Sequence, residues 1–278
     1  MSNPLLEKWH TPFEMPPFEH IQSAHFSEAF ELALQRNQAE IDQIANQTLP
    51  ATFENTLLAL ESSGELLNQT ASVFFNLSSS HTSPEIQEIE RVMAPRLAAH
   101  SAALFLNGPL FQRIEKIYAD RNSLGLDAES IRLVERYHLD FVRAGAKLKD
   151  QDRVVFAKNT ERLASLFTAF SQNVLADEAS FSLLLTQEDE LKGLPEFVRS
   201  AAQKMAKDRG MTEANAHVIT LSRSSLTPFM TFSERRDLRQ KLWTAWCQRG
   251  ENEGGHNNNQ IMREILQLRL AQAKLLGY

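Results

Sequence analysis

The sequence has few of the features that mark a secreted or membrane-spanning protein. Cys247 is the only cysteine among 278 residues, which excludes an internal disulfide. No apolar run reaches the ~18 residues that a membrane-spanning helix needs. The first twenty residues also lack the basic stretch and apolar core of a signal peptide. These absences predict a cytoplasmic protein with no membrane partner.

An excess of positive charge is missing as well. The sequence holds 29 Lys and Arg against 35 Asp and Glu, a net charge of −6, and its charges are interspersed without a block of five like charges. Binding a nucleic-acid backbone depends on a surplus of Lys and Arg. We therefore expect no nucleic-acid partner.

Familiar catalytic motifs do not occur. A zinc hydrolase of the H-E-x-x-H type places two histidines one helical turn apart, so that both imidazoles share one face. The sequence has eight histidines, and none lies four residues from another. There is no G-x-S-x-G and no phosphate-binding P-loop pattern. The residues therefore give no catalytic, cofactor-binding or metal-ligating assignment.

Single reactive side chains favour structural roles. His20 and His25 straddle a predicted helix start, and we interpret them as structural, because a metal site needs converging ligands. His138 and Asp140 lie two apart on a predicted helix, where their side chains diverge. Cys247 lies in "LWTAWCQRG". We interpret it as a half-buried packing residue, because free cysteine usually behaves as a small hydrophobe.

The loop "RGENEGGHNNNQ" is the nearest approach to a ligand-binding motif. Its glycines, asparagines and histidine suggest a phosphate or metal site, but it follows a helix rather than a strand and lacks the lysine of a phosphate loop. We interpret it as a helix connection in which one asparagine caps the next helix. Asn257, Asn258, Asn259 and Tyr278 remain candidates for lining a substrate channel, although their spacing gives no reason to prefer them.

Helical periodicity dominates the chain after a segment with four prolines, residues 1–24, which we predict to be extended, with Trp9, Phe13 and Phe18 as anchors. The Ser83–Pro84–Glu85 triplet is a strong helix start. We expect helices over 25–47, 52–76, 84–106, 109–121, 127–145, 150–175, 195–209, 233–249 and 258–276.

Two short apolar stretches interrupt the helices. "SFSLLL" (180–185) and "HVITLS" (217–222) are rich in apolar and β-branched residues and are flanked by turn signals. We predict that they form one antiparallel ribbon. The fold class is therefore mainly α, and residues 25–278 are expected to form one helical domain.

The last predicted helix has an unusually wide apolar surface. Two neighbouring rows of apolar residues run along it: Ile261, Ile265, Leu268, Ala271 and Leu275, and beside them Met262, Leu266, Leu270, Ala273 and Leu276. A surface this wide is typical of a well-buried helix. It predicts that further protein packs against it.

Several long segments of the sequence are distinctive when taken in order. They include "NPLLEKWHTPFEMPPFEHIQSAHFSEAFELAL", "TFENTLLALESSGELL", "RYHLDFVRAGAKL", "FSQNVLADEASF" and "HVITLSRSSLTPFMTFSERRDLRQKLWTAWCQRGENEGGHNNNQ". These segments resemble the N-terminal part of the thimet-oligopeptidase-like zinc metallopeptidases, and the resemblance covers residues 3–278. The bacterial peptidyl-dipeptidases and their oligopeptidase relatives look most similar.

The resemblance implies the N-terminal, non-catalytic region of a longer, two-halved enzyme that encloses a channel. Zinc would be held by H-E-x-x-H and a further glutamate in the missing C-terminal catalytic half, so no ligand is carried over to this sequence. Short peptides would be the substrates of the full-length enzyme, and this chain would be one wall of the channel, inactive alone. The alternative is a stand-alone helical module that binds peptides or proteins without catalysis.

Overall fold

A computed structural model describes residues 3–213, 215–252 and 254–278, which divide into two compact units. Unit 1 comprises the described residues of Met1–Thr168 together with Ile265–Tyr278, and unit 2 comprises those of Ala169–Glu264. Two helices, α7 (Asp150–Ser180) and α11 (Asn259–Leu275), each contribute residues to both units. The fold is mainly α, as the sequence predicted.

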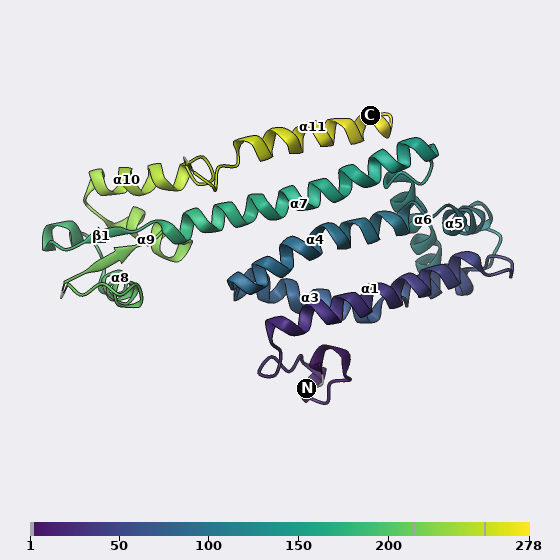
Figure 1. The fold of residues 1–278 in the computed structure, drawn as a ribbon, viewed down its shortest axis with the longest axis horizontal. Coiled ribbons are helices and arrows are strands. Elements are labelled where there is room, and N and C mark those ends of the chain that lie inside the picture. Colours follow the sequence, from purple (N-terminus) through teal and green to yellow (C-terminus); the bar gives the residue numbers. More distant parts are fainter. Residues whose placement is uncertain (1–2, 214, 253) are drawn as a thin grey trace. The chain divides into compact units, whose positions relative to one another are not determined.

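Unit 1 is a set of helices packed around α1. Figure 1 shows α1, α3 and α4 side by side, and α1 also contacts α5. The elements of this unit before α7 are η1 (Pro4–Leu6), η2 (Pro12–Glu14), α1 (Ser23–Asn46), η3 (Phe53–Leu58), α2 (Ala59–Glu61), α3 (Glu65–Ser80), α4 (Pro84–Phe105), α5 (Gly108–Asp120) and α6 (Ala128–Arg143).

Aromatic side chains fill both ends of the core of unit 1. Near the start of α1, Phe74 meets Phe26 and Phe30 edge to face, with ring centroids 5.1 and 5.3 Å apart. Near its end, Phe141 lies 5.0 Å from Phe105 and 6.2 Å from Phe111. These aromatic pairs stabilise the folded state beyond what the burial of their apolar area alone contributes.

Helix starts in unit 1 follow the capping residues in the sequence. Ser83 accepts a hydrogen bond from the backbone N–H of Ile86 at 3.3 Å, and Asp127 accepts one from Ser130 at 2.7 Å. Each cap satisfies a backbone donor that has no partner within the helix. The predicted starts of α4 and α6 are therefore confirmed.

The prediction of one continuous helix over 52–76 is wrong, because the helix is interrupted at Gly64. That residue has φ +74, and its N–H donates to the Glu40 carboxylate at 2.7 Å. A Cβ at this position would lie 2.9 Å from Asn37 Nδ2. Glycine is required by both the left-handed backbone and the close approach, so η3 and α2 end here and α3 begins.

The N-terminal segment is anchored by one aromatic rather than three. Trp9 packs against the core near the start of α1, and its indole N–H donates to Pro4 O at 2.8 Å. Phe13 is 98% exposed and Phe18 is 42% exposed. Phe13 adopts φ +59 within the turn η2, and its ring packs against nothing in the core.

Unit 2 is built on the predicted two-stranded ribbon. β1 (Leu183–Leu185) pairs antiparallel with β2 (His217–Ile219), with Leu184 opposite Val218. Helix α8 (Glu196–Asp208) contacts β2, and η4 (Glu188–Leu191), α9 (Arg223–Phe232) and α10 (Arg236–Cys247) complete the unit. Phe229, Leu242 and Leu185 are fully buried at its centre.

The start predicted for the helix over 233–249 is wrong. Ser233 ends α9, where its N–H donates to Phe229 O at 3.0 Å, and α10 begins at Arg236. The sequence pattern predicted no helix directly before Ser233. In the structure α9 occupies this segment and includes Pro228.

The apolar surface of the last helix, α11, is covered only in part by this chain. Ile265 is buried, but Leu266 is 66% exposed and Leu270 is 57% exposed. Within unit 1, Gln272 Nε2 donates to Thr160 Oγ1 at 2.9 Å and the Arg269 guanidinium lies 5.1 Å from the Phe167 ring. Among the residues described, no helix combines the length and apolar character needed to cross a membrane.

Candidate functional site

The Gly/Asn/His loop is held by its own unit rather than open to a ligand. Asn258 is only 1% exposed; its Nδ2 donates to Phe170 O at 3.1 Å and its Oδ1 accepts from Asn173 at 2.8 Å. Gly250, with φ +77, approaches Asn258 so closely that a Cβ would lie 2.8 Å from that side chain. Asn258 is therefore a structural residue of a helix connection.

Asp177 anchors the other end of the same loop. Its carboxylate accepts hydrogen bonds from Gly250 N at 2.7 Å and from Asn252 Nδ2 at 2.9 Å, and the residue is 8% exposed. Asn257 Oδ1 accepts from Asn259 N at 2.9 Å, so an asparagine does satisfy the start of α11. The interpretation as a helix connection fits these bonds.

Two of the candidate histidines, His25 and His138, have structural partners. His25 Nδ1 accepts a hydrogen bond from Gln22 N at 3.0 Å at the start of α1. His138 stacks on Tyr118 with ring centroids 3.8 Å apart, whereas Asp140 accepts from Arg136 Nε at 2.9 Å. His138 and Asp140 therefore do not form a dyad, as the helical spacing predicted.

Burial lowers the pKa of two histidines in unit 1. It is the main cause that lowers the pKa of His138, with Lys147 and Arg121 lowering it further and Glu115 opposing them. Burial also lowers the pKa of His100, whose Nε2 lies 2.7 Å from Asn37 Oδ1. Both groups favour the neutral form because their charged form is poorly solvated.

Cys247 and Tyr278 are both exposed to solvent. Cys247 is exposed at the last residue of α10, so its prediction as a half-buried packing residue is wrong. The helix periodicity placed it beside two tryptophans, but the buried face of α10 is formed by Leu238 and Leu242. Tyr278 is 83% exposed.

A metal ion does not fit the part of the chain that the structure describes. Across residues 3–213, 215–252 and 254–278, no three His, Cys, Asp or Glu side chains converge in a way that could hold one. The zinc implied by the resemblance therefore has no ligand set among them.

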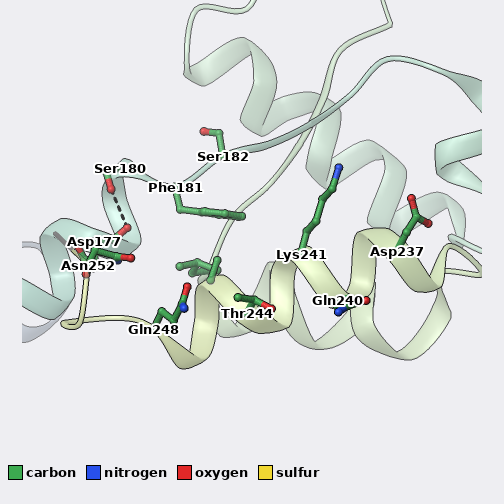
Figure 2. Close-up of a pocket in the computed structure, with 12 residues that line it drawn as sticks. Asp177, Ser180, Phe181, Ser182, Asp237, Gln240, Lys241, Thr244, Gln248 and Asn252 are labelled. Carbon is green, nitrogen blue, oxygen red and sulfur yellow. Dashed lines mark hydrogen bonds between the residues drawn. The ribbon is translucent and has the colours of Figure 1, made fainter.

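A concave site lies in unit 2, in a pocket of about 850 Å³ between α10 and the segment from the end of α7 to β1. Figure 2 shows the labelled side chains of α10 with Phe181 and Ser182 across from them. The residues that line the pocket are Asp177, Ser180, Phe181, Ser182, Leu221, Asp237, Gln240, Lys241, Thr244, Ala245, Gln248 and Asn252.

The carboxylates of this pocket already have partners. Asp177 is bonded to the loop, and Asp237 accepts from Arg235 Nε at 3.0 Å and from its NH2 nitrogen at 2.8 Å. The Arg235 side chain is the leading cause that lowers the pKa of Asp237. The backbone of Phe181 is held by Arg209, whose guanidinium donates to Phe181 O at 2.7 Å.

Four other polar side chains of the pocket, from α10 and its C-terminal end, lack such partners among the described residues. Gln240, Lys241, Thr244 and Gln248 are exposed, and none makes a side-chain hydrogen bond or ion pair with another described residue. The sequence reasoning missed this pocket, because residues 177–182 and 237–252 converge only in the fold. The signal in the sequence was the spacing of Gln240, Thr244 and Gln248, which places them on one helical face.

A comparison with protein families finds a match near the end of the chain. A family model described as Peptidase family M3 matches residues 229–278, which contain the end of α9 and all of α10 and α11. This finding agrees with the resemblance drawn from the sequence.

The particular relatives are dipeptidyl carboxypeptidases and oligopeptidases. The chain is 34% identical to the dipeptidyl carboxypeptidase of Salmonella typhimurium over 277 residues, which is 100% of this chain and 40% of that protein. It is 36% identical to the Escherichia coli dipeptidyl carboxypeptidase over 276 residues, 99% of the chain and 40% of that protein. With oligopeptidase A of Escherichia coli it shares 30% over 282 residues, again 100% of the chain and 40% of the relative.

The resemblance predicted from the sequence is thus confirmed, and the matched part is the N-terminal portion of these relatives. The chain spans about 40% of the length of the curated relatives it matches.

Proposed function

We propose that this chain is the non-catalytic N-terminal region of a cytoplasmic zinc metallopeptidase that cleaves short peptides. The enzyme would be a peptidyl-dipeptidase that releases C-terminal dipeptides, or an oligopeptidase. The observation that carries the proposal is the similarity to dipeptidyl carboxypeptidases and oligopeptidase A over essentially the whole chain, with coverage of only 40% of each relative.

In this proposal the chain forms one wall of the substrate channel and is inactive alone. Residues 1–24 and the helical region 25–278 both belong to the non-catalytic part, and zinc is bound by the remainder of the longer protein. One feature of the sequence supports this: it has no H-E-x-x-H.

The first test is to read the native gene beyond the codon for Tyr278. We expect the frame to continue for several hundred residues and to encode H-E-x-x-H. A stop codon at that point would contradict the proposal and favour the stand-alone binding module.

A second test uses the 278-residue chain itself. We expect no cleavage when the purified chain is incubated with zinc and a mixture of short peptides, as followed by mass spectrometry. Zinc-dependent release of dipeptides by the chain alone would contradict its assignment as a non-catalytic region.

The stand-alone binding module is the second candidate, and one observation favours it. Met262, Leu266 and Leu270 share one row on α11 and are 37%, 66% and 57% exposed. A row of exposed apolar side chains is a common feature of interaction surfaces. In the first proposal the same row is covered by the remainder of the enzyme.

A further inference from the structure

The polar face of α10 has a spacing that suits an extended peptide. Gln240, Thr244 and Gln248 follow one another at intervals of four residues along the pocket. Four residues of an α-helix rise about 6 Å, and two residues of an extended chain rise about 6.6 Å. Alternate amide groups of a peptide lying along α10 would therefore meet successive side chains of this row.

The chemistry of the row matches peptide amides. A glutamine side chain offers both an amide N–H donor and a carbonyl acceptor, and a threonine hydroxyl can do either. Within the described part of the chain these three side chains have no protein partner, so a ligand would not have to break internal bonds to reach them.

Lys241, which lines the pocket, favours a negatively charged group on the ligand. Three lining residues are charged, and the carboxylates of Asp177 and Asp237 are already bonded to Gly250 and Arg235. The ammonium group of Lys241 makes no ion pair with any described side chain. A carboxylate is the natural partner of such a group in a pocket.

An apolar wall completes the site. Phe181 and Ala245 are half-buried and Leu221 is 2% exposed, and all three line the same pocket. They offer apolar surface for one side chain of the peptide while the polar row holds its main chain.

We propose that the pocket of unit 2 binds an extended peptide, with its main-chain amides along Gln240, Thr244 and Gln248 and one of its carboxylates at Lys241. The proposal rests on the proposed function for the ligand class, since peptides are the substrates it names. The carboxylate comes either from the peptide's C-terminus or from an acidic side chain.

The test measures peptide binding by fluorescence anisotropy with the complete 278-residue chain. Three labelled hexapeptides of alanine and glycine are compared: one with a free C-terminus, one amidated, and one amidated with an internal glutamate. The variants are Lys241→Met, the double change Gln240→Ala with Gln248→Ala, and the control Lys204→Met. Lys204 is exposed on α8 in the same unit and does not line the pocket.

We expect Lys241→Met to weaken binding of a carboxylate-bearing peptide about 2- to 5-fold, as an exposed ion pair would. The double glutamine variant should weaken all three peptides about 5- to 10-fold, because it removes two hydrogen-bonding groups. Lys204→Met should bind like the unmodified chain. Circular dichroism of each variant establishes that the helices are retained.

The peptide set distinguishes the two sources of the carboxylate. If amidation weakens binding and the internal glutamate does not restore it, Lys241 holds the C-terminal carboxylate. If the glutamate restores it, an acidic side chain suffices. The absence of binding, or equal binding by the unmodified chain and all its variants, would overturn the proposal.

Failure of this inference is separate from failure of the proposed function. A gene that continues into H-E-x-x-H while the pocket variants bind peptides normally would overturn the pocket assignment alone. A stop codon after Tyr278 together with pocket-dependent binding would overturn the peptidase assignment alone.

Discussion

Two cationic side chains, one in each unit, show how differently the units use polar groups. In unit 1, Arg113 donates to the carbonyl oxygen of Leu49 at 2.9 Å, to Asn55 Oδ1 at 2.8 Å and to the buried Thr56 hydroxyl at 3.2 Å. In unit 2, Lys241 has no hydrogen-bonded or charged partner within the described residues. A cation bonded to several acceptors of its own unit fixes the fold, whereas an unpaired cation in a pocket can recognise a ligand.

Aromatic side chains differ in the same way. Phe141 in unit 1 is fully buried against Phe105 and Phe111. In unit 2, Phe197 and Phe232 meet edge to face at 6.1 Å but remain 61% and 41% exposed. Phe141 therefore belongs to the interior of unit 1, whereas Phe197 and Phe232 lie at the surface of unit 2.

The largest expected effect compares aromatic truncations in the two units. Phe141→Ala should lower the free energy of unfolding by about 3–5 kcal/mol, because it removes a fully buried ring and leaves a cavity. Phe197→Ala should cost less than about 1 kcal/mol, since most of that ring is already in water. Urea denaturation followed by circular dichroism measures both, and equal losses would show that the comparison of the two rings is wrong.

A smaller effect compares the two cations directly. Arg113→Met should destabilise the protein by about 1–3 kcal/mol, because several acceptors of unit 1 lose their donor. Lys241→Met should change stability by no more than about 0.5 kcal/mol. The same denaturation experiment applies. If Lys241→Met proved as destabilising as Arg113→Met, Lys241 would have a structural partner and would not be available to a ligand.

The smallest effect is a pH dependence from unit 1. The folded state lowers the pKa of His138, so below the ordinary histidine value of about 6.5 the unfolded chain binds a proton more readily than the folded chain. Stability should therefore fall as the pH drops through that value and level off below the folded pKa.

His138→Gln should reduce this loss of stability between pH 7.5 and 5.5, measured as the difference between unfolding free energies at the two values. His100 contributes in the same direction, so part of the dependence remains in the variant. An unchanged pH dependence in His138→Gln would contradict the assignment.

Local signals in the sequence predicted most helix and strand positions. The Ser83–Pro84 start and the positions of the two short strands each depend on residues close together in the chain. The helix break at Gly64 was not predicted, because a glycine within a helix costs little free energy. The close approach of Asn37, which requires glycine here, involves a residue 27 positions away.

Burial and the pocket were harder to predict for one physical reason. Periodicity shows which residues share a face, but it does not show what covers that face. The same pattern correctly predicted α11 and its apolar rows, but it does not show what would cover the exposed side chains of Leu266 and Leu270. The pocket likewise requires Phe181 and α10 to approach each other in space, and no local pattern encodes that approach.

The position of Cys247 has a practical consequence. It is the only thiol in the sequence, it is exposed, and it precedes Gln248, a residue of the pocket. A maleimide dye or a nitroxide spin label would therefore attach at a single known place on the last turn of α10. Such a probe can report peptide occupancy by its emission or its mobility, without the introduction or removal of any cysteine.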